Sequence, residues 1–98
     1  LSKDSYITWN TNIKTLDYIY LDLNNVDEYK IITLYWAKEN EDFTDESSID
    51  VLLKPGKYKY QIPVINNNTN IDKIRLAFNN TPNVDLNINS IDFYTKNN

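Results

Sequence analysis

Outward-facing tyrosines are the side chains of this 98-residue chain that best fit ligand binding. Tyr18, Tyr20 and Tyr35 alternate with aliphatic residues, so their rings lie opposite the aliphatic face of a strand. Flat rings pack on the apolar side of a pyranose, and neighbouring polar groups hydrogen-bond its hydroxyls. These tyrosines, together with Tyr58 and Tyr60, predict a carbohydrate-binding platform. The alternative is that they cover half of a sandwich, since Tyr is a favoured strand residue.

Two further residues are candidate ligand contacts. Arg75, the only arginine, alternates outward from Ile74 and Leu76. Its guanidinium could bind a carboxylate or a pair of sugar hydroxyls in a bidentate manner, or form an ion pair within the domain. Trp9 ends a short apolar segment beside Asn10, and it could either stack on a sugar or pack in the core.

An acidic segment is the only candidate for a metal site. Glu39, Glu41, Asp42, Asp45 and Glu46 supply oxygen ligands of the kind that calcium prefers. The segment lacks the glycine that an EF-hand loop requires. We expect a solvated acidic loop and no cofactor, with structural calcium as the alternative.

The composition argues against an enzyme. The chain contains neither His nor Cys, so the usual proton shuttle and every thiolate metal ligand are missing. Paired carboxylates could hydrolyse a glycoside only across a cleft with a fixed separation, which no sequence pattern here indicates. We therefore predict no catalytic residues.

Charge and length restrict the partners. The 10 basic and 14 acidic residues give a net charge of -4, and the bases are scattered, so nucleic acid is not an expected partner. No apolar run approaches the roughly 20 residues that span a bilayer. The chain begins at Leu1, which suggests a fragment of a longer protein, and its abundance of Asn, Ile, Lys and Tyr suggests a low-GC bacterium.

Period-two alternation predicts strands throughout the chain. In one of them Trp36 shares a face with Ile32 and Leu34, which predicts that the indole packs in the core. The predicted strands cover 6–9, 18–23, 31–36, 49–53, 58–64, 73–78 and 84–94.

The last strand contains a change of phase. Leu86 and Ile88 share a face, but Ile91 and Phe93 lie one residue out of step, so a bulge is expected near Asn89 and Ser90. Turn residues separate the strands at 24–25, 55–56, 66–70 and 79–83. Seven strands at this spacing predict one domain over residues 1–98, an all-β antiparallel β-sandwich.

The order of these motifs resembles a known family. Leu34-Tyr35-Trp36, the acidic loop with Phe43, the Pro55-Gly56 turn, Ile74-Arg75-Leu76 and the closing run 84–93 resemble galactose-binding-like jelly-roll modules. Such carbohydrate-binding-type modules are appended to bacterial glycosyltransferases, glycoside hydrolases and surface proteins. The resemblance covers roughly residues 17–94. It implies a jelly-roll sandwich, a glycan or envelope polysaccharide as partner, and a place at the cell surface, in the envelope or outside the cell.

Together the residues and the resemblance predict a non-catalytic carbohydrate-binding accessory module of a bacterial envelope or surface protein. Its predicted ligand-binding residues are Tyr18, Tyr20, Tyr35, Arg75 and Trp9. The alternative is a structural or protein-interaction sandwich. Such a domain would position a neighbouring catalytic or membrane segment of the same protein and bind no sugar.

Overall fold

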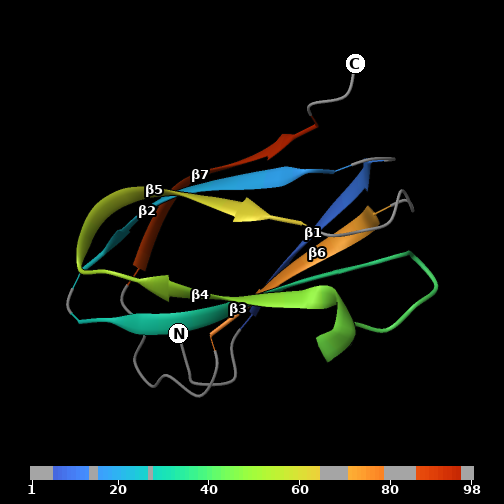
Figure 1. The fold of residues 1–98 in the computed structure, drawn as a ribbon, viewed down its shortest axis with the longest axis horizontal. Coiled ribbons are helices and arrows are strands. Elements are labelled where there is room, and N and C mark those ends of the chain that lie inside the picture. Colours follow the sequence, from blue (N-terminus) through green and yellow to red (C-terminus); the bar gives the residue numbers. More distant parts are fainter. Residues whose placement is uncertain (1–5, 14–15, 27, 65–70, 79–85, 96–98) are drawn as a thin grey trace.

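The described part of the chain is an all-β, two-layer antiparallel sandwich, as the alternation predicts (Figure 1). The computed structural model describes residues 6–13, 16–26, 28–64, 71–78 and 86–95. Within these ranges the strands are β1 (Tyr6–Ile13), β2 (Tyr18–Asn25), β3 (Lys30–Ala37), β4 (Ser48–Leu53), β5 (Gly56–Pro63), β6 (Ile71–Ala77) and β7 (Leu86–Tyr94).

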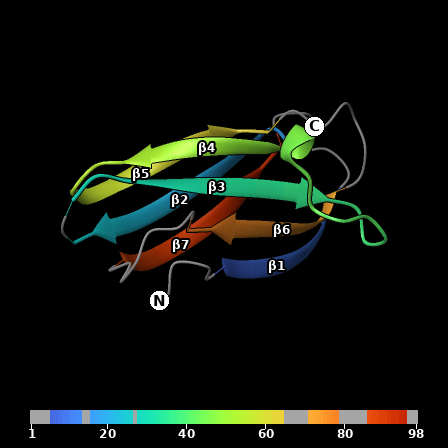
Figure 2. The same ribbon diagram turned by 90° about the horizontal axis from the view of Figure 1, so that it is seen from below.

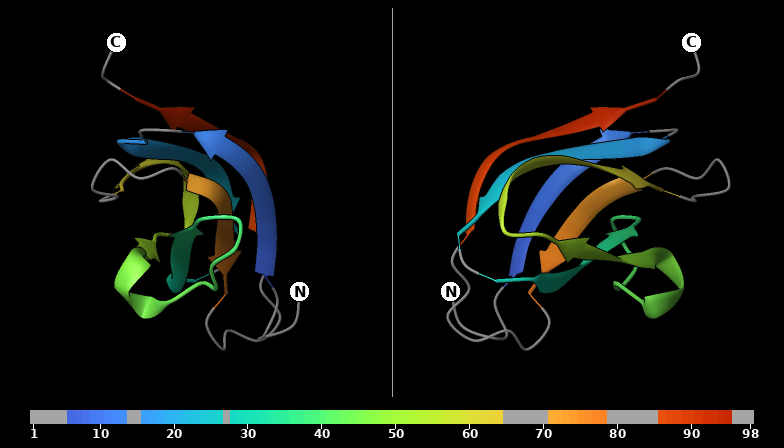
Figure 3. Two further views of the ribbon diagram at one scale, coloured as in Figure 1. Left: turned by 90° about the vertical axis from the view of Figure 1, so that its right-hand side faces the viewer. Right: turned by 60° about the vertical axis from the view of Figure 1, so that its left-hand side comes forward.

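The strands divide into a four-stranded sheet and a three-stranded sheet. Sheet A has the order β1-β6-β3-β4, and its strands follow one another across the near side of Figure 2. Sheet B has the order β5-β2-β7 and forms the second layer in Figure 3. Among the described strands, only β3 and β4 are both consecutive and paired. The chain therefore passes from one layer to the other at most of its connections, which ties the two sheets together.

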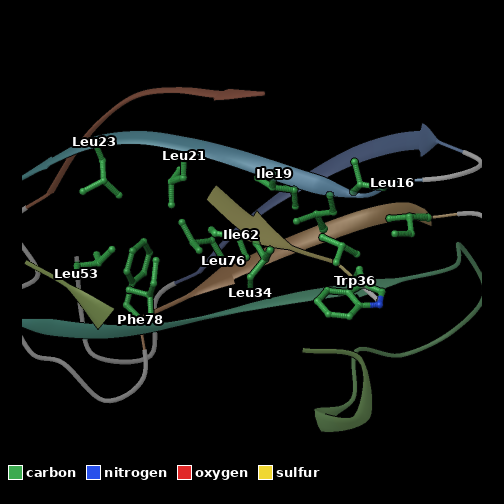
Figure 4. Close-up of a cluster of buried hydrophobic side chains, with 14 residues drawn as sticks. Leu16, Ile19, Leu21, Leu23, Leu34, Trp36, Leu53, Ile62, Leu76 and Phe78 are labelled. Carbon is green, nitrogen blue, oxygen red and sulfur yellow. The ribbon is translucent and has the colours of Figure 1, made fainter. Parts of the chain in front are cut away.

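The core lies between the sheets and consists of aliphatic side chains from alternate strand positions (Figure 4). Ile19, Leu21 and Leu23 of β2 are fully buried against residues of sheet A such as Leu34 and Leu76. Each such side chain contributes about 1.5–3 kcal/mol on burial, so this layer dominates the stability of the fold. Trp36 is 7% exposed and belongs to the same cluster, which confirms its predicted place in the core.

The predicted bulge in the last strand is present. Asp22 of β2 lies opposite Ser90, whereas the next residue, Leu23, lies opposite Ile88, so Asn89 has no partner in the register. This extra residue restores the phase of β7. As a result, Ile88 and Ile91 both pack against the core.

The expected turn at Asn24 and Asn25 is wrong, because both residues belong to β2. The Asn25 side chain is fully buried, and its Nδ2 donates to the Glu28 carbonyl at 2.8 Å and to the Leu53 carbonyl at 3.4 Å. Its Oδ1 accepts a hydrogen bond from Lys30 Nζ at 2.7 Å. The side-chain amide thus satisfies two backbone carbonyls and the Lys30 ammonium at the end of the sandwich. In a turn the same amide would face water. The expected turns at 66–70 and 79–83 lie outside the described residues, as do Val84 and the end of the chain.

We predict that Asn25→Ala lowers the free energy of unfolding by about 1–3 kcal/mol, because it leaves buried polar partners without their hydrogen bonds. Urea denaturation measures the change. The control is Asn24→Ala, on the outer side of the same strand, which should change stability much less. Equal effects of the two substitutions would contradict a structural role for the buried amide.

The predicted turn lies where β4 connects to β5, and thus sheet A to sheet B, with Pro55 between the strands and Gly56 as the first residue of β5. Gly56 has a φ of 114°, a conformation that L side chains rarely adopt. A Cβ at this position would also lie 3.3 Å from Cε2 of the Tyr58 ring.

We predict that Gly56→Ala costs about 1–3 kcal/mol of unfolding free energy, through backbone strain at this corner. Thermal or urea unfolding of the variant measures the loss. Lys57→Ala, one residue along and exposed, is the control and should be close to neutral. An unchanged midpoint for Gly56→Ala would show that the corner relaxes without cost.

Candidate functional site

The structure divides the predicted ligand-binding residues between two opposite faces. Tyr35 and Arg75 lie opposite each other on adjacent strands of sheet A, and both alternate with buried neighbours, so they face outward. Tyr18 and Tyr20 lie on the outer face of sheet B. The expected single platform is therefore two separate surfaces.

The surface of sheet A is hollowed around Arg75. We call this hollow the arginine-aromatic cleft; it is open to solvent and measures about 400 Å³. Its lining residues come from β1, β3, β6 and the loop after β3: Tyr6, Tyr35, Phe43, Thr44, Asp45, Arg75 and Ala77.

The register of three strands explains the hollow. Thr8 of β1, Arg75 of β6 and Tyr35 of β3 form one outward row across sheet A. In the next row Ala77 lies beside Tyr6 of β1. The methyl group of Ala77 is too short to fill the space between the larger side chains of the neighbouring strands, so the surface is recessed there.

Two rings hold the guanidinium of Arg75. Its Cζ lies 3.8 Å from the centroid of the Tyr6 ring and 4.5 Å from that of Phe43. Its Nε donates a hydrogen bond to Thr8 Oγ1 at 3.1 Å. Cation-π contacts at such distances favour a fixed guanidinium position.

The expected ion pair of Arg75 is not formed with any described residue. Thr8, Tyr6 and Phe43 are its described contacts, and the hydrogen bond to Thr8 uses the Nε donor alone. The two Nη groups of an arginine carry the remaining four of its five N–H donors. Because Arg75 lines the cleft together with Asp45, the cleft combines charged donors with a carboxylate acceptor.

Phe43 reaches the cleft from the acidic loop 38–47, whose last three residues form the short 3-10 helix η1 (Asp45–Ser47). Its ring packs edge-on against Tyr35, with centroids 6.1 Å apart and planes at 62°, and Lys73 Nζ lies 5.0 Å from its centroid. The loop is attached to sheet A where the Glu39 amide donates to Asp72 Oδ2 at 2.9 Å. The loop therefore presents an aromatic ring to the cleft.

Sequence patterns did not identify Tyr6 and Phe43 as site residues. Tyr6 alternates with Ile7 and Trp9, so the outward direction of its ring was available from the pattern. Phe43 lies in a loop without periodicity, and nothing in its spacing indicates that it folds back onto Arg75.

The second aromatic surface lies on sheet B. We call Tyr18, Tyr20 and Tyr94 the tyrosine cluster; their ring centroids are 6.2–6.5 Å apart. In the register Tyr18 lies beside Tyr94, and Tyr20 lies between Gln61 and Asp92. The sequence pattern predicted Tyr18 and Tyr20 as ligand contacts. Tyr94 joins them because the bulge in β7 shifts the register of its second half.

Of the remaining predicted aromatics, Trp9 and Tyr60 pack inward, and Tyr58 is exposed at the edge of sheet B. Trp9 lies opposite Ile74 and packs against the core, so it belongs to neither surface. Tyr60 also packs against the core, and its hydroxyl accepts a hydrogen bond from the Lys54 amide at 2.9 Å. Tyr58 shares the side of β5 that carries Tyr60, with centroids 6.1 Å apart.

Among the described residues, no three acidic side chains lie close enough together to hold a metal ion. Nor does the described part of the chain contain a helix of the length and apolarity needed to cross a membrane. Comparisons with family models, curated proteins and solved structures gave no match.

We predict that Phe43→Ala loosens loop 38–47, which keeps its hydrogen bond to Asp72 but loses the contacts of the ring with Tyr35, Arg75 and Lys73. The contact with Tyr35 alone is worth about 0.5–1.5 kcal/mol. Amide hydrogen exchange should become faster in the loop and stay unchanged in β2. Thr44→Ala, which keeps the ring, is the control. Unchanged loop protection in the Phe43 variant would contradict an anchoring role.

Proposed function

We propose that this chain is a non-catalytic carbohydrate-binding module whose ligand occupies the arginine-aromatic cleft. The observation that carries the proposal is the placement of Arg75 in an open hollow, fixed by two rings and Thr8, with its Nη donors unused by described residues. A group held in this way is already oriented for a ligand and loses little conformational entropy on binding.

The chemistry of the cleft fits a polyhydroxylated ligand. Each sugar hydroxyl both donates and accepts hydrogen bonds, and the cleft offers the donors of Arg75, the acceptors of Asp45 and the hydroxyl of Thr44. Tyr35 adds aromatic surface for the C–H groups of a pyranose, whereas Phe43, with Arg75 and Lys73 near its ring, holds the guanidinium in place. A volume of about 400 Å³ falls within the usual range for small-molecule sites, about 300–1,000 Å³.

Two observations favour binding over catalysis. Asp45 is the only carboxylate among the described residues that line the cleft, whereas glycoside hydrolysis normally uses a pair. The chain also lacks His and Cys, which removes the commonest acid-base and nucleophilic groups.

The finer parts of the proposal rest on the order of motifs in the sequence. They are the galactose-binding-like jelly-roll type and a role as an accessory module in a bacterial envelope, surface or secreted protein, with an envelope polysaccharide or other glycan as the partner. The two antiparallel sheets agree with this class of module. The fold alone carries no function, so the glycan assignment depends on the cleft.

A second candidate function is protein interaction, which an exposed aliphatic pair favours. Ile31 and Leu52 lie opposite each other on β3 and β4 and are 51% and 55% exposed. Tyr29, in the connection before β3, is 63% exposed. Such side chains suit a partner domain better than a sugar.

To test the proposal, amide chemical shifts of the labelled domain are recorded while neutral and acidic oligosaccharides are added, with and without calcium. Shifts should cluster on β1, β3 and β6 around Thr8, Tyr35 and Arg75. Arg75→Ala should weaken binding at the cleft by roughly 10- to 150-fold, the loss expected for hydrogen bonds from a charged donor.

The control is Lys57→Ala, which removes one positive charge from the other sheet and should leave the affinity of the cleft unchanged. Silence of the cleft amides across the whole panel would contradict the proposal. Shifts confined to Ile31 and Leu52 on addition of a neighbouring domain of the parent protein would favour the protein-interaction function.

A further inference from the structure

The outer face of sheet B has the composition of a second ligand site. Its three tyrosine rings form a compact group, with centroid distances of 6.5 Å for Tyr18–Tyr20, 6.3 Å for Tyr18–Tyr94 and 6.2 Å for Tyr20–Tyr94. Tyr94 is 46% exposed, and the other two rings are half-buried. The group is therefore accessible aromatic surface.

The residues around these rings are polar. Gln61 and Asp92 lie on either side of Tyr20 in the register, and in the next row Asp22 lies between Lys59 and Ser90. Among the described residues of this face, Pro63 is the only aliphatic one. A protein-docking face would be depleted in charged groups at its centre, so the surface fits a ligand that carries many hydroxyls.

The ring geometry restricts the kind of glycan. The planes of Tyr18 and Tyr20 are inclined by 35°, those of Tyr18 and Tyr94 by 37°, and those of Tyr20 and Tyr94 by 70°. Such rings cannot all lie flat on a planar, crystalline polysaccharide. Lys59 Nζ lies 5.2 Å from the centroid of Tyr20, which leaves Tyr18 and Tyr94 as the stacking faces.

The charge of this face restricts the ligand further. Asp22 and Asp92 lie beside the cluster, and Lys57 and Lys59 of β5 share the same outer face, so two negative and two positive charges balance. A neutral chain gains hydrogen bonds from all of these groups and meets no net repulsion. A polyanionic or polycationic chain would meet like charges at some of them.

We propose that the tyrosine cluster is a second binding site, for a single neutral glycan chain, and that the domain is therefore bivalent. The assignment of the ligand class rests on the proposed function, but the site does not share a residue with the arginine-aromatic cleft. Because the two sites lie on the outer faces of opposite sheets (Figure 3), both can be occupied at once. One domain then joins two glycan chains.

The test uses variants with matched controls. Tyr94→Ala removes the most exposed ring of the cluster and should weaken binding at sheet B roughly two- to tenfold, with the cleft unaffected. Tyr58→Ala is the control, because Tyr58 is also 46% exposed but lies outside the cluster. Arg75→Ala should weaken the cleft and leave the cluster unaffected. Far-ultraviolet circular dichroism checks that each variant is folded.

Labelled protein is titrated with cello-, manno- and galacto-oligosaccharides, and amide shifts at Asp22, Ser90 and Asp92 report the cluster separately from shifts at Thr8 and Arg75. In parallel, light scattering follows the cross-linking of soluble galactomannan by the wild-type domain. Two responsive sets of amides, and scattering that either variant reduces, support the proposal.

Other outcomes separate the two proposals. Shifts at the cleft alone, insensitive to Tyr94→Ala, overturn the second site and leave the proposed function standing. Shifts at the cluster alone support the site on sheet B but overturn both the cleft assignment and bivalence. If none of these sugars shifts the amides of either face, the second site is overturned. If the acidic sugars are also silent, the proposed function is overturned as well.

Discussion

The aliphatic layer between the two sheets is the interaction on which the rest of the structure depends. Ile19, Leu21 and Leu23 of β2 must all point inward to remain buried, and this fixes the direction of every intervening side chain. A slip of one residue would expose the whole row, so the register is strongly specified. Both aromatic surfaces are therefore determined by the core. Tyr18 and Tyr20 face outward because their neighbours are buried, and so does Arg75 on the other sheet.

The cleft depends on this register in a more specific way. The Tyr6, Thr8 and Tyr35 side chains meet around Arg75 only because β1 and β3 both pair with β6. The acidic loop then adds Phe43, which the sheet alone could not supply. The loop therefore helps to build the cleft, a role that needs no metal. Its carboxylates are exposed to water, and its single aromatic residue packs over the guanidinium of Arg75.

Alternation in the sequence predicted the strands and the bulge, because inward and outward positions are a local property. It could not assign strands to sheets, because alternation is the same in both layers. For that reason Tyr20 and Tyr35 were expected on one platform, although they lie on opposite faces. Asn favours turns, so the pattern predicted a turn at Asn25. Its burial depends on partners elsewhere in the chain, in β4 and in the β2–β3 connection, which local sequence does not show. The position of Phe43 depends on a loop folding over a sheet, which has no periodic signature.

The bulge at Asn89 determines on which side of sheet B the end of β7 places its side chains. Ahead of it, Leu86 and Ile88 point inward at even-numbered positions; beyond it, the inward positions are odd-numbered. If the same residues ran on from Ile88 in regular alternation, with no bulge, Tyr94 would share the inward phase of Ile88 and could not join Tyr18 on the outside. The three-ring group therefore depends on the sheet taking up one extra residue between Ile88 and Ile91, and not only on the identity of the rings.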